Sequence, residues 1–134
     1  FLESAHPPTR VVVMVQREVA RNMAAQPGAM SLMSVGIQLY GRPRIVTNVP
    51  PMSFYPPPKV TSSVVTFYPR PREDHAPQFA DVEKVTQAGF GQRRKMIRKS
   101  LKDYCNSFSI CAIEDTNRAE NLEIKDFLCI AKNS

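Results

Sequence analysis

The sequence predicts an α/β fold in its N-terminal part and an all-α arrangement in its C-terminal part. A β-branched run at residues 10–15 is followed at once by a helical pattern, and a strand joined directly to a helix is half of a βαβ unit. Beyond residue 77 the β-branched runs stop and helical spacing takes over. A chain of 134 residues is long enough for one domain, or for a small domain and a piece of another.

The N-terminal part contains three predicted strands and one predicted helix. Residues 10–15 include a continuous apolar run, which is the pattern of a strand covered on both faces. Residues 16–25 place their apolar side chains on one face and stop before a Pro-Gly pair, so we predict a helix there. Residues 33–40 and 59–68 alternate apolar and polar side chains, which predicts two further strands.

The C-terminal part is predicted to be helical. Three of its segments have helical spacing and no β-branched run: residues 81–90, 92–104 and 124–131. A polar, proline-rich linker at residues 71–77 precedes them. We therefore predict two domains, one at residues 1–74 and one at residues 75–134.

Composition narrows the classes of function. No apolar run approaches the ~18–20 residues that a membrane-spanning helix needs, and no signal peptide is visible, so we expect a cytoplasmic protein with no membrane partner. The net charge of +6 and the pI near 9.5 favour a polyanionic partner such as nucleic acid. An ordinary basic protein would have the same overall charge, so the charge alone leaves both interpretations open.

The cysteines predict neither a metal site nor a disulfide framework. Cys105, Cys111 and Cys129 are odd in number and show no Cys-x-x-Cys spacing, and the two histidines lie far from them in the sequence. Zinc ligands normally come in closely spaced pairs, so we predict that no metal is bound. Reduced, partly buried thiols of a cytosolic protein are the expected state of all three cysteines.

Residues 90–102 form a basic segment that carries six of the 18 lysines and arginines and no acidic residue. The spacing predicts one amphipathic helix, with Ile97 and Leu101 on its apolar stripe and with Arg94, beside that stripe, paired with an acid such as Glu120. A phosphate backbone would relieve the mutual repulsion of the other cations. The predicted RNA-binding residues are Arg93, Lys95, Arg98, Lys99 and Lys102. The alternative is a solvated helix face without a partner.

Residues 50–58, PPMSFYPPP, form a proline-rich loop directly before the last predicted strand. Proline fixes φ and biases its predecessor toward extended conformations, so residues 55–58 are predicted to be a stiff rod of polyproline II type. Such a rod would hold Phe54 in a fixed place. Phe54 could then plug a core, or it could offer the flat apolar face on which an unpaired base stacks.

Four stretches, in this order along the chain, resemble the ribosomal RNA adenine dimethyltransferases. The longest is VPPMSFYPPPKVTSSVV at residues 49–65, which is similar to the family signature VPPxxFxPPPKVxSxVV. The others are VQREVA at residues 15–20, FGQRRK at residues 90–95 and NRAENL at residues 117–122. The last two favour the bacterial small-subunit (16S) branch over the large-subunit resistance methyltransferases, which share the proline-rich loop. Residues 29–34 depart from the Tyr-Gly-x-Leu-Ser pattern that is usual in the family.

The resemblance implies an S-adenosylmethionine-dependent enzyme. It would dimethylate the N6 amines of two adjacent adenines in small-subunit rRNA, on the 30S pre-ribosomal particle, during ribosome biogenesis. The implied fold is a Rossmann-like methyltransferase domain followed by a small helical domain that binds rRNA. Residues 33–40 and 59–68 would be the antiparallel strands that end its sheet. Phe54 would stack on the flipped target adenine.

The resemblance also identifies motifs that this sequence does not contain. The family's glycine-rich cofactor turn, its acidic ribose ligand and its Asn-Leu-Pro-Tyr catalytic motif precede the segment that Phe1 begins, and no GxGxxG pattern occurs here. We therefore expect the C-terminal portion of such an enzyme, inactive by itself and without cofactor-binding residues of its own. The alternative is a non-enzymatic rRNA-binding factor of ribosome assembly on the same scaffold.

Overall fold

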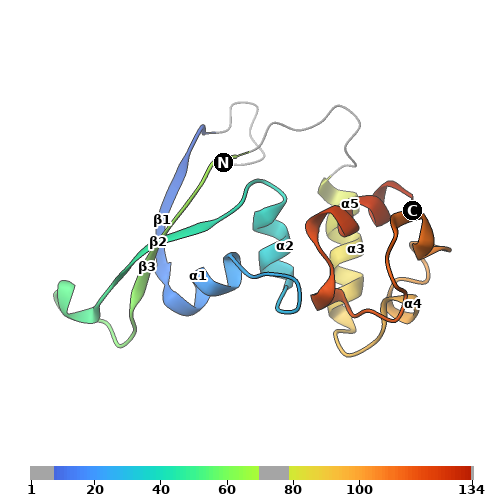
Figure 1. Ribbon diagram of the computed structural model, residues 1–134. Helices are drawn as coiled ribbons and strands as arrows, with labels where there is room; N and C mark the ends of the chain where they lie inside the picture. The colour runs from blue at the N-terminus through green and yellow to red at the C-terminus, as the bar shows by residue number, and fades with distance from the viewer. Residues whose placement is uncertain (1–7, 70–78, 134) are drawn as a thin grey trace. The chain divides into compact units, whose positions relative to one another are not determined.

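The computed structural model describes residues 8–69 and 79–133 (Figure 1). The chain divides into two compact units, one made of Phe1–Ala25 with Ile37–Pro71 and one made of Gln26–Gly36 with Arg72–Ser134. We refer to them as the sheet unit and the helical unit. The predicted domain boundary after residue 74 lies outside the described residues, so that division into domains stays a prediction.

The elements of the two units follow one another along the chain. Those of the sheet unit are β1 (Val11–Gln16), α1 (Arg17–Met23), β2 (Arg44–Val49), the 3₁₀ turn η1 (Pro51–Ser53) and β3 (Ser62–Phe67). Those of the helical unit are α3 (Phe79–Gly91), α4 (Ile97–Ser100), the 3₁₀ turns η2 (Phe108–Cys111) and η3 (Ala119–Asn121), and α5 (Ile124–Lys132). Helix α2 (Leu32–Gln38) contributes residues to both units.

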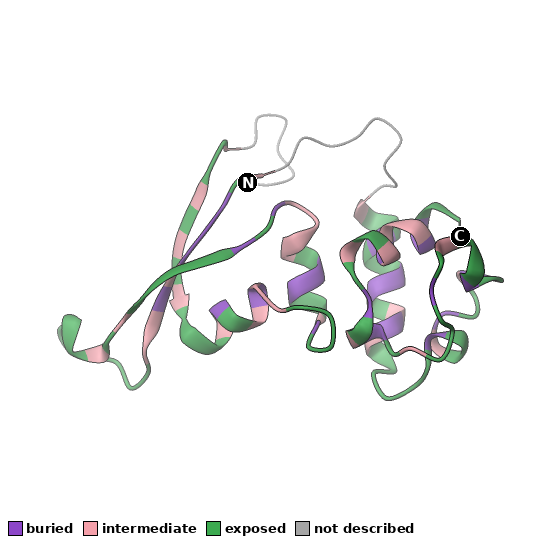
Figure 2. Ribbon diagram, in the orientation of Figure 1, coloured by how far each residue is buried: buried purple, intermediate pink, exposed green. Residues whose placement is uncertain are grey.

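The sheet has the strand order β1-β3-β2, and both pairs of neighbours are antiparallel. Val65 of the central strand β3 lies opposite Val13 on one side and Ile45 on the other, and Val46 forms a bulge in β2. Val65 is fully buried, where Ala20 and Met23 of α1 pack on it. The core of the sheet unit therefore lies between β3 and α1 (Figure 2).

The expectation that the first strand is covered on both faces is wrong. Val12 and Met14 of β1 are 56% and 52% exposed, and they alternate with half-buried neighbours. The reason is the pairing: within the described residues β1 has only β3 beside it, and α1 covers a single face. One face of this sheet is consequently apolar and exposed.

The strand predicted at residues 33–40 is also wrong, because this stretch forms α2. Ser31 starts the helix: its backbone N–H donates to the hydroxyl of Ser34 at 2.7 Å, and the N–H of Ser34 donates back to the hydroxyl of Ser31 at 3.3 Å. At the other end Gln38 donates to the carbonyl oxygens of Met23 and Ala25 at 3.0 and 2.9 Å. The local bonds between Ser31 and Ser34 and the longer-range bonds of Gln38 together override the alternating pattern.

The strand that precedes β3 is β2, which the sequence analysis did not predict. The antiparallel pair implied by the resemblance is therefore β2 with β3. Gly41 makes the connection from α2 to β2 possible, because a Cβ atom there would lie 2.7 Å from the carbonyl oxygen of Tyr68 and 2.8 Å from the ring of Phe67. Any side chain at this position would collide with backbone.

The helical unit is built on α3 and α5, which confirms the helices predicted at residues 81–90 and 124–131. Val82 and Val85 of α3 and Phe127 and Ile130 of α5 are all fully buried. The rings of Phe90 and Phe127 stack with centroids 5.9 Å apart. Burial of these faces supplies the main driving force for the unit. No helix of the described residues is long and apolar enough to cross a membrane.

The single helix predicted at residues 92–104 is wrong. The chain turns after α3, Met96 pairs with Arg118 in an isolated β-bridge, and only α4 is helical. The N–H of Ile97 donates to the carbonyl of Asn117 at 2.7 Å, and that of Arg98 donates to the carbonyl of Asp115 at 3.2 Å. These long-range bonds take the donors that a continuous helix would use internally.

The family-like stretch at residues 117–122 packs against the end of α3, directly before the stretch at residues 90–95. A Cβ atom on Gly89 would lie 3.2 Å from Cβ of Ala119 and 3.7 Å from Cδ2 of Leu101, so the glycine lets α3 approach η3 closely. Ala119 and Leu101 are fully buried. The side chain of Asn121 then accepts the N–H of Arg118 at 3.1 Å and fixes η3.

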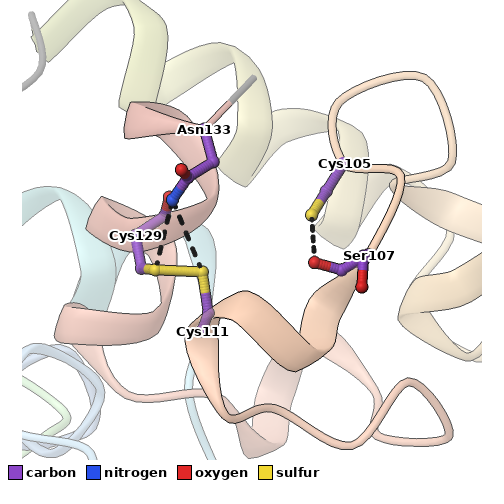
Figure 3. The surroundings of a disulfide bond; sticks show 5 residues. All are labelled: Cys105, Ser107, Cys111, Cys129 and Asn133. Atoms are coloured by element: carbon purple, nitrogen blue, oxygen red, sulfur yellow. Dashed lines mark hydrogen bonds between the residues drawn. A yellow bond between two sulfur atoms is a disulfide. The ribbon is translucent and has the colours of Figure 1, made fainter.

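The expectation of three reduced cysteines is wrong for two of them. Cys111 and Cys129 form a disulfide that links the end of η2 to α5 across 18 residues of sequence (Figure 3). Cys105 is a free, buried thiol whose sulfur donates to the carbonyl oxygen of Ser107 at 3.3 Å. Asn133 donates to the carbonyl oxygen of Cys129 at 2.8 Å.

Overpacking at Gly89 tests the close approach of α3 to η3. We expect Gly89→Leu to destabilise the chain by about 1–3 kcal/mol, because the new side chain would displace Ala119 and Leu101. Gly91→Leu is the matched control, since a Cβ atom on Gly91 meets nothing within 4 Å. Thermal unfolding of the chain, followed by circular dichroism, would show a lower midpoint for the first variant only. Equal midpoints would contradict the packing described here.

Counting thiols tests the disulfide. After denaturation without reductant, we expect a thiol reagent to label one cysteine, Cys105; after reduction it should label three. Reduction of this disulfide, which joins residues 18 apart in the sequence, should also lower the midpoint of thermal unfolding of the wild type. In the double variant Cys111→Ser with Cys129→Ser, reductant should not change the midpoint. Three labelled thiols in the unreduced chain would show that the bond is absent.

Candidate nucleic-acid interface

The proline-rich loop holds Phe54 half-buried. Pro51–Ser53 form η1, and the N–H of Phe54 donates to the carbonyl oxygen of Pro51 at 3.2 Å. The neighbours Met52 and Tyr55 are 92% and 100% exposed. The fold therefore holds Phe54 by a backbone bond, yet the residue stays partly open to solvent.

The loop is not the continuous rod that the sequence predicted. The chain bends over residues 54–56, and the Tyr55–Pro56 peptide bond is cis. Beyond this bend the loop runs into β3.

The end of the loop meets the start of α1. The N–H of Arg17 donates to the carbonyl oxygen of Thr61 at 2.9 Å. A groove of ≈260 Å³ lies at this junction, with Arg17, Glu18 and Lys59 among its lining residues. Another pair of family-like stretches, residues 15–20 and residues 49–65, is thus joined at one end of the sheet.

The five predicted RNA-binding cations are all exposed in the helical unit. Arg93 and Lys95 lie in the turn after α3, Arg98 and Lys99 lie in α4, and Lys102 follows α4. Arg93 also stands over the ring of Phe90, with its guanidinium carbon 5.9 Å from the centroid.

These cations are exposed because buried residues beside them in the sequence anchor the segment to the core. Ile97 and Leu101 are fully buried and alternate with the charged residues of α4 and the turn after it. The backbone bonds of Ile97 and Arg98 to residues 117 and 115 fix the same segment. The cationic surface therefore rests on packed core, although it is not one continuous helix.

No ion pair among the described residues neutralises the cationic surface. The predicted pair of Arg94 with Glu120 is absent, and the backbone carbonyl of Glu120 instead accepts the N–H groups of Gly28 and Met30 at 2.8 and 3.3 Å. The ion pair that does form, between Lys125 and Glu123 at 3.1 Å, lies outside the basic segment. The hydrogen bond and charge of Glu123 raise the pKa of Lys125, with a smaller effect from Asp126.

Arg98 and Lys102 also border a cavity that the sequence analysis did not find. Its volume is ≈500 Å³, and it is lined by residues between 98 and 115. Arg93, Lys95 and Lys99 are not among them. No local motif could have identified this cavity, because its walls come from α4, from η2 and from the turns that follow each of them.

No cluster of His, Cys, Asp and Glu side chains that could hold a metal ion occurs among residues 8–69 and 79–133.

Comparison with protein families and curated proteins gives one consistent match. A family model described as "Ribosomal RNA adenine dimethylase" matches residues 1–134. The protein named "Ribosomal RNA small subunit methyltransferase A" of Dehalococcoides mccartyi is 38% identical over 141 residues, which cover 97% of this chain and 48% of that protein. The protein of the same name from Mesorhizobium japonicum is 43% identical over 125 residues, or 88% and 43% of the two chains. The chain therefore spans about half the length of these relatives.

Solved structures show the same fold. A dimethyladenosine transferase from Plasmodium falciparum matches with a TM-score of 0.76 and 21% identity, over 96% of this chain and 59% of that one. The 23S rRNA methyltransferase ErmE matches with a TM-score of 0.66 and 16% identity, over 93% and 54% of the two chains. This chain thus has the fold of the corresponding parts of these methyltransferases.

Matched triple substitutions test whether the basic segment binds RNA. We expect Lys95→Gln, Lys99→Gln and Lys102→Gln together to weaken RNA binding and to reduce the slope of log K against log salt concentration by about 2–3, since each phosphate contact contributes roughly 0.7–0.9. Fluorescence anisotropy with a labelled RNA at several salt concentrations measures both quantities.

The control removes the same charge elsewhere in the helical unit, with Lys84→Gln, Lys125→Gln and Lys132→Gln. We expect this second triple variant to retain most of the affinity and the slope. Equal losses in the two variants would mean that overall charge, and not the basic segment, controls binding.

Proposed function

The chain belongs to the ribosomal RNA adenine dimethylase family, and from this premise we propose that it is part of an enzyme that dimethylates the N6 amines of two adjacent adenines in small-subunit rRNA. The observation that carries the proposal is the identity of 38% and 43% to proteins named small-subunit methyltransferases, over nearly the whole chain. The 30S pre-ribosomal particle, in the cytoplasm, is the proposed site of action.

S-adenosylmethionine is the proposed methyl donor, and neither the groove at the start of α1 nor the turn after β1 supports a site for it. The groove at the start of α1 measures ≈260 Å³, below the roughly 300–1,000 Å³ of typical ligand sites, and its walls carry Arg17, Glu18 and Lys59. No glycine-rich turn follows β1, which passes directly into α1. We therefore assign the cofactor and the catalytic motif to the half of the longer relatives that this chain does not span.

Phe54 is the proposed platform for the target adenine. A base that leaves its helix loses its stacking partners, so an enzyme that acts on it must offer an apolar face in their place. Phe54 is partly open to solvent, and its backbone is bonded to Pro51. Tyr55 is fully exposed, so the fold gives it no such fixed position.

The basic segment is proposed to bind the rRNA backbone. Its cations are exposed, are unpaired within the described part of the chain and rest on buried Ile97 and Leu101. Contacts of this kind position an RNA without reading its sequence. The segment would therefore supply affinity, while the remainder of the enzyme selects the two adenines.

A non-enzymatic assembly factor on the same scaffold is the second candidate function. The exposed cations of the basic segment, which have no ion-pair partner in the described part of the chain, would bind RNA whether or not the full-length protein methylates it. Incubation of the full-length protein with S-adenosylmethionine and small subunits that lack the modification separates the two functions. We expect dimethyladenosine to form with the full-length protein and not with residues 1–134 alone. Binding without any methylation by the full-length protein would support the assembly factor.

Replacing the aromatic ring tests the proposed role of Phe54. In the full-length protein we expect Phe54→Ala to lower the methylation rate about 5- to 150-fold, because stacking on one base is worth ~1–3 kcal/mol. The affinity for small subunits should change less than about twofold, and Phe54→Tyr should restore most of the rate.

Tyr55→Ala is the control for this substitution, because its side chain is fully exposed in the same loop. It should leave both rate and affinity near the wild-type values. An equal loss of rate and affinity in Phe54→Ala would indicate collapse of the loop and would contradict the stacking role.

A further inference from the structure

We propose that the ≈500 Å³ cavity of the helical unit binds a single unpaired nucleotide of the RNA, with a phosphate on its cations and the base on its apolar floor. The inference rests on the proposed function, because it takes RNA as the ligand. The volume lies within the roughly 300–1,000 Å³ of sites that bind small molecules. We call it the nucleotide cavity.

The walls of the nucleotide cavity combine two kinds of chemistry. Arg98 and Lys102, four residues apart, bring two exposed cations to it. Phe108 and Ile113, which are 7% and 8% exposed, give it an apolar floor. A simple anion would leave the floor unused, and an apolar ligand would leave the cations unpaired. A nucleotide satisfies both, since it joins a phosphate to a flat, largely apolar base.

The rim carries side chains that can hydrogen-bond the edge of a base. Asn106 is exposed, and its side chain makes no hydrogen bond to another residue in the described part of the chain, so its amide can both donate and accept. The carboxylate of Asp115 has no ion-pair partner in the described part of the chain. The backbone N–H of Arg98 donates to the backbone carbonyl of Asp115 and leaves the carboxylate available. A carboxylate accepts hydrogen bonds only, so it favours adenine, whose exocyclic amine offers two N–H donors, over uracil, which offers only its N3–H.

The structure holds the cavity in shape without a ligand. The N–H of Ile113 donates to the carbonyl of Phe108 at 3.1 Å, and this bond links the two residues of the apolar floor. The free thiol of Cys105 binds the carbonyl of Ser107, and the disulfide from Cys111 fixes the end of η2 (Figure 3). A preformed site avoids the cost of ordering these loops on binding.

Mononucleotide binding to the chain tests the proposal directly. The probes are AMP, UMP, ribose 5-phosphate and inorganic phosphate, followed by nuclear magnetic resonance titration. We expect AMP to bind about 5- to 100-fold more tightly than ribose 5-phosphate, which has the phosphate but no base. AMP should also bind more tightly than UMP, and Asp115→Asn should reduce that difference.

Blocking the cavity provides the matched variants. Ser109→Trp places a large ring on an exposed lining residue and should abolish the preference for AMP, whereas Thr116→Trp, exposed but outside the lining, should preserve it. Lys102→Gln should weaken AMP binding more than Lys99→Gln, because only Lys102 lines the cavity. Equal affinities for AMP, ribose 5-phosphate and phosphate, or an unchanged preference in Ser109→Trp, would overturn the proposal.

Failure of this inference can be told apart from failure of the proposed function. If AMP shows no preference while the full-length protein still methylates small subunits, the nucleotide cavity alone is disproved. If AMP binds as expected and methylation does not occur, the cavity stands and the enzymatic assignment fails.

Discussion

The close contact between Gly89 and Ala119 is the constraint on which the RNA-facing surface depends. It lets α3 lie against η3, and the basic segment that follows α3 is not one continuous helix. The chain turns instead, and Ile97 bonds to the backbone at residue 117. Leu101 is fully buried beside Gly89, with its Cδ2 atom 3.7 Å from where a Cβ atom on the glycine would lie. The cations between these buried residues are thereby directed outward, and two of them border the nucleotide cavity.

In the sheet unit, backbone hydrogen bonds likewise hold the residue that is proposed to bind the base, Phe54. The bond from Arg17 to Thr61 joins α1 to the end of the proline-rich loop, and η1 gives Phe54 its backbone partner. Ordering this loop on folding costs little conformational entropy, because its prolines already restrict the unfolded chain. Val12 and Met14 are exposed on the sheet, while α1 and Ile37 of α2 pack against the core at Val65.

The sequence predicted the elements that local patterns determine and failed where distant residues decide. The strands β1 and β3 and the helices α1, α3 and α5 follow directly from their spacing. Residues 33–40 alternate like a strand, but the paired bonds of Ser31 and Ser34 make them a helix. The break in the basic segment depends on backbone partners about 20 residues away, so no local pattern could reveal it. The exposure of the five cations was predictable, whereas the cavity and the Cys111–Cys129 bond required the fold.

We propose above all that the cationic surface of the helical unit contacts small-subunit rRNA in the full-length protein. Ultraviolet crosslinking of the full-length protein to small subunits, followed by mass spectrometry of the crosslinked peptides, measures that contact directly. We expect crosslinked nucleotides on peptides that contain Phe54 and on peptides within residues 93–109. Crosslinks confined to other parts of the protein, with both of these regions unmodified, would contradict it.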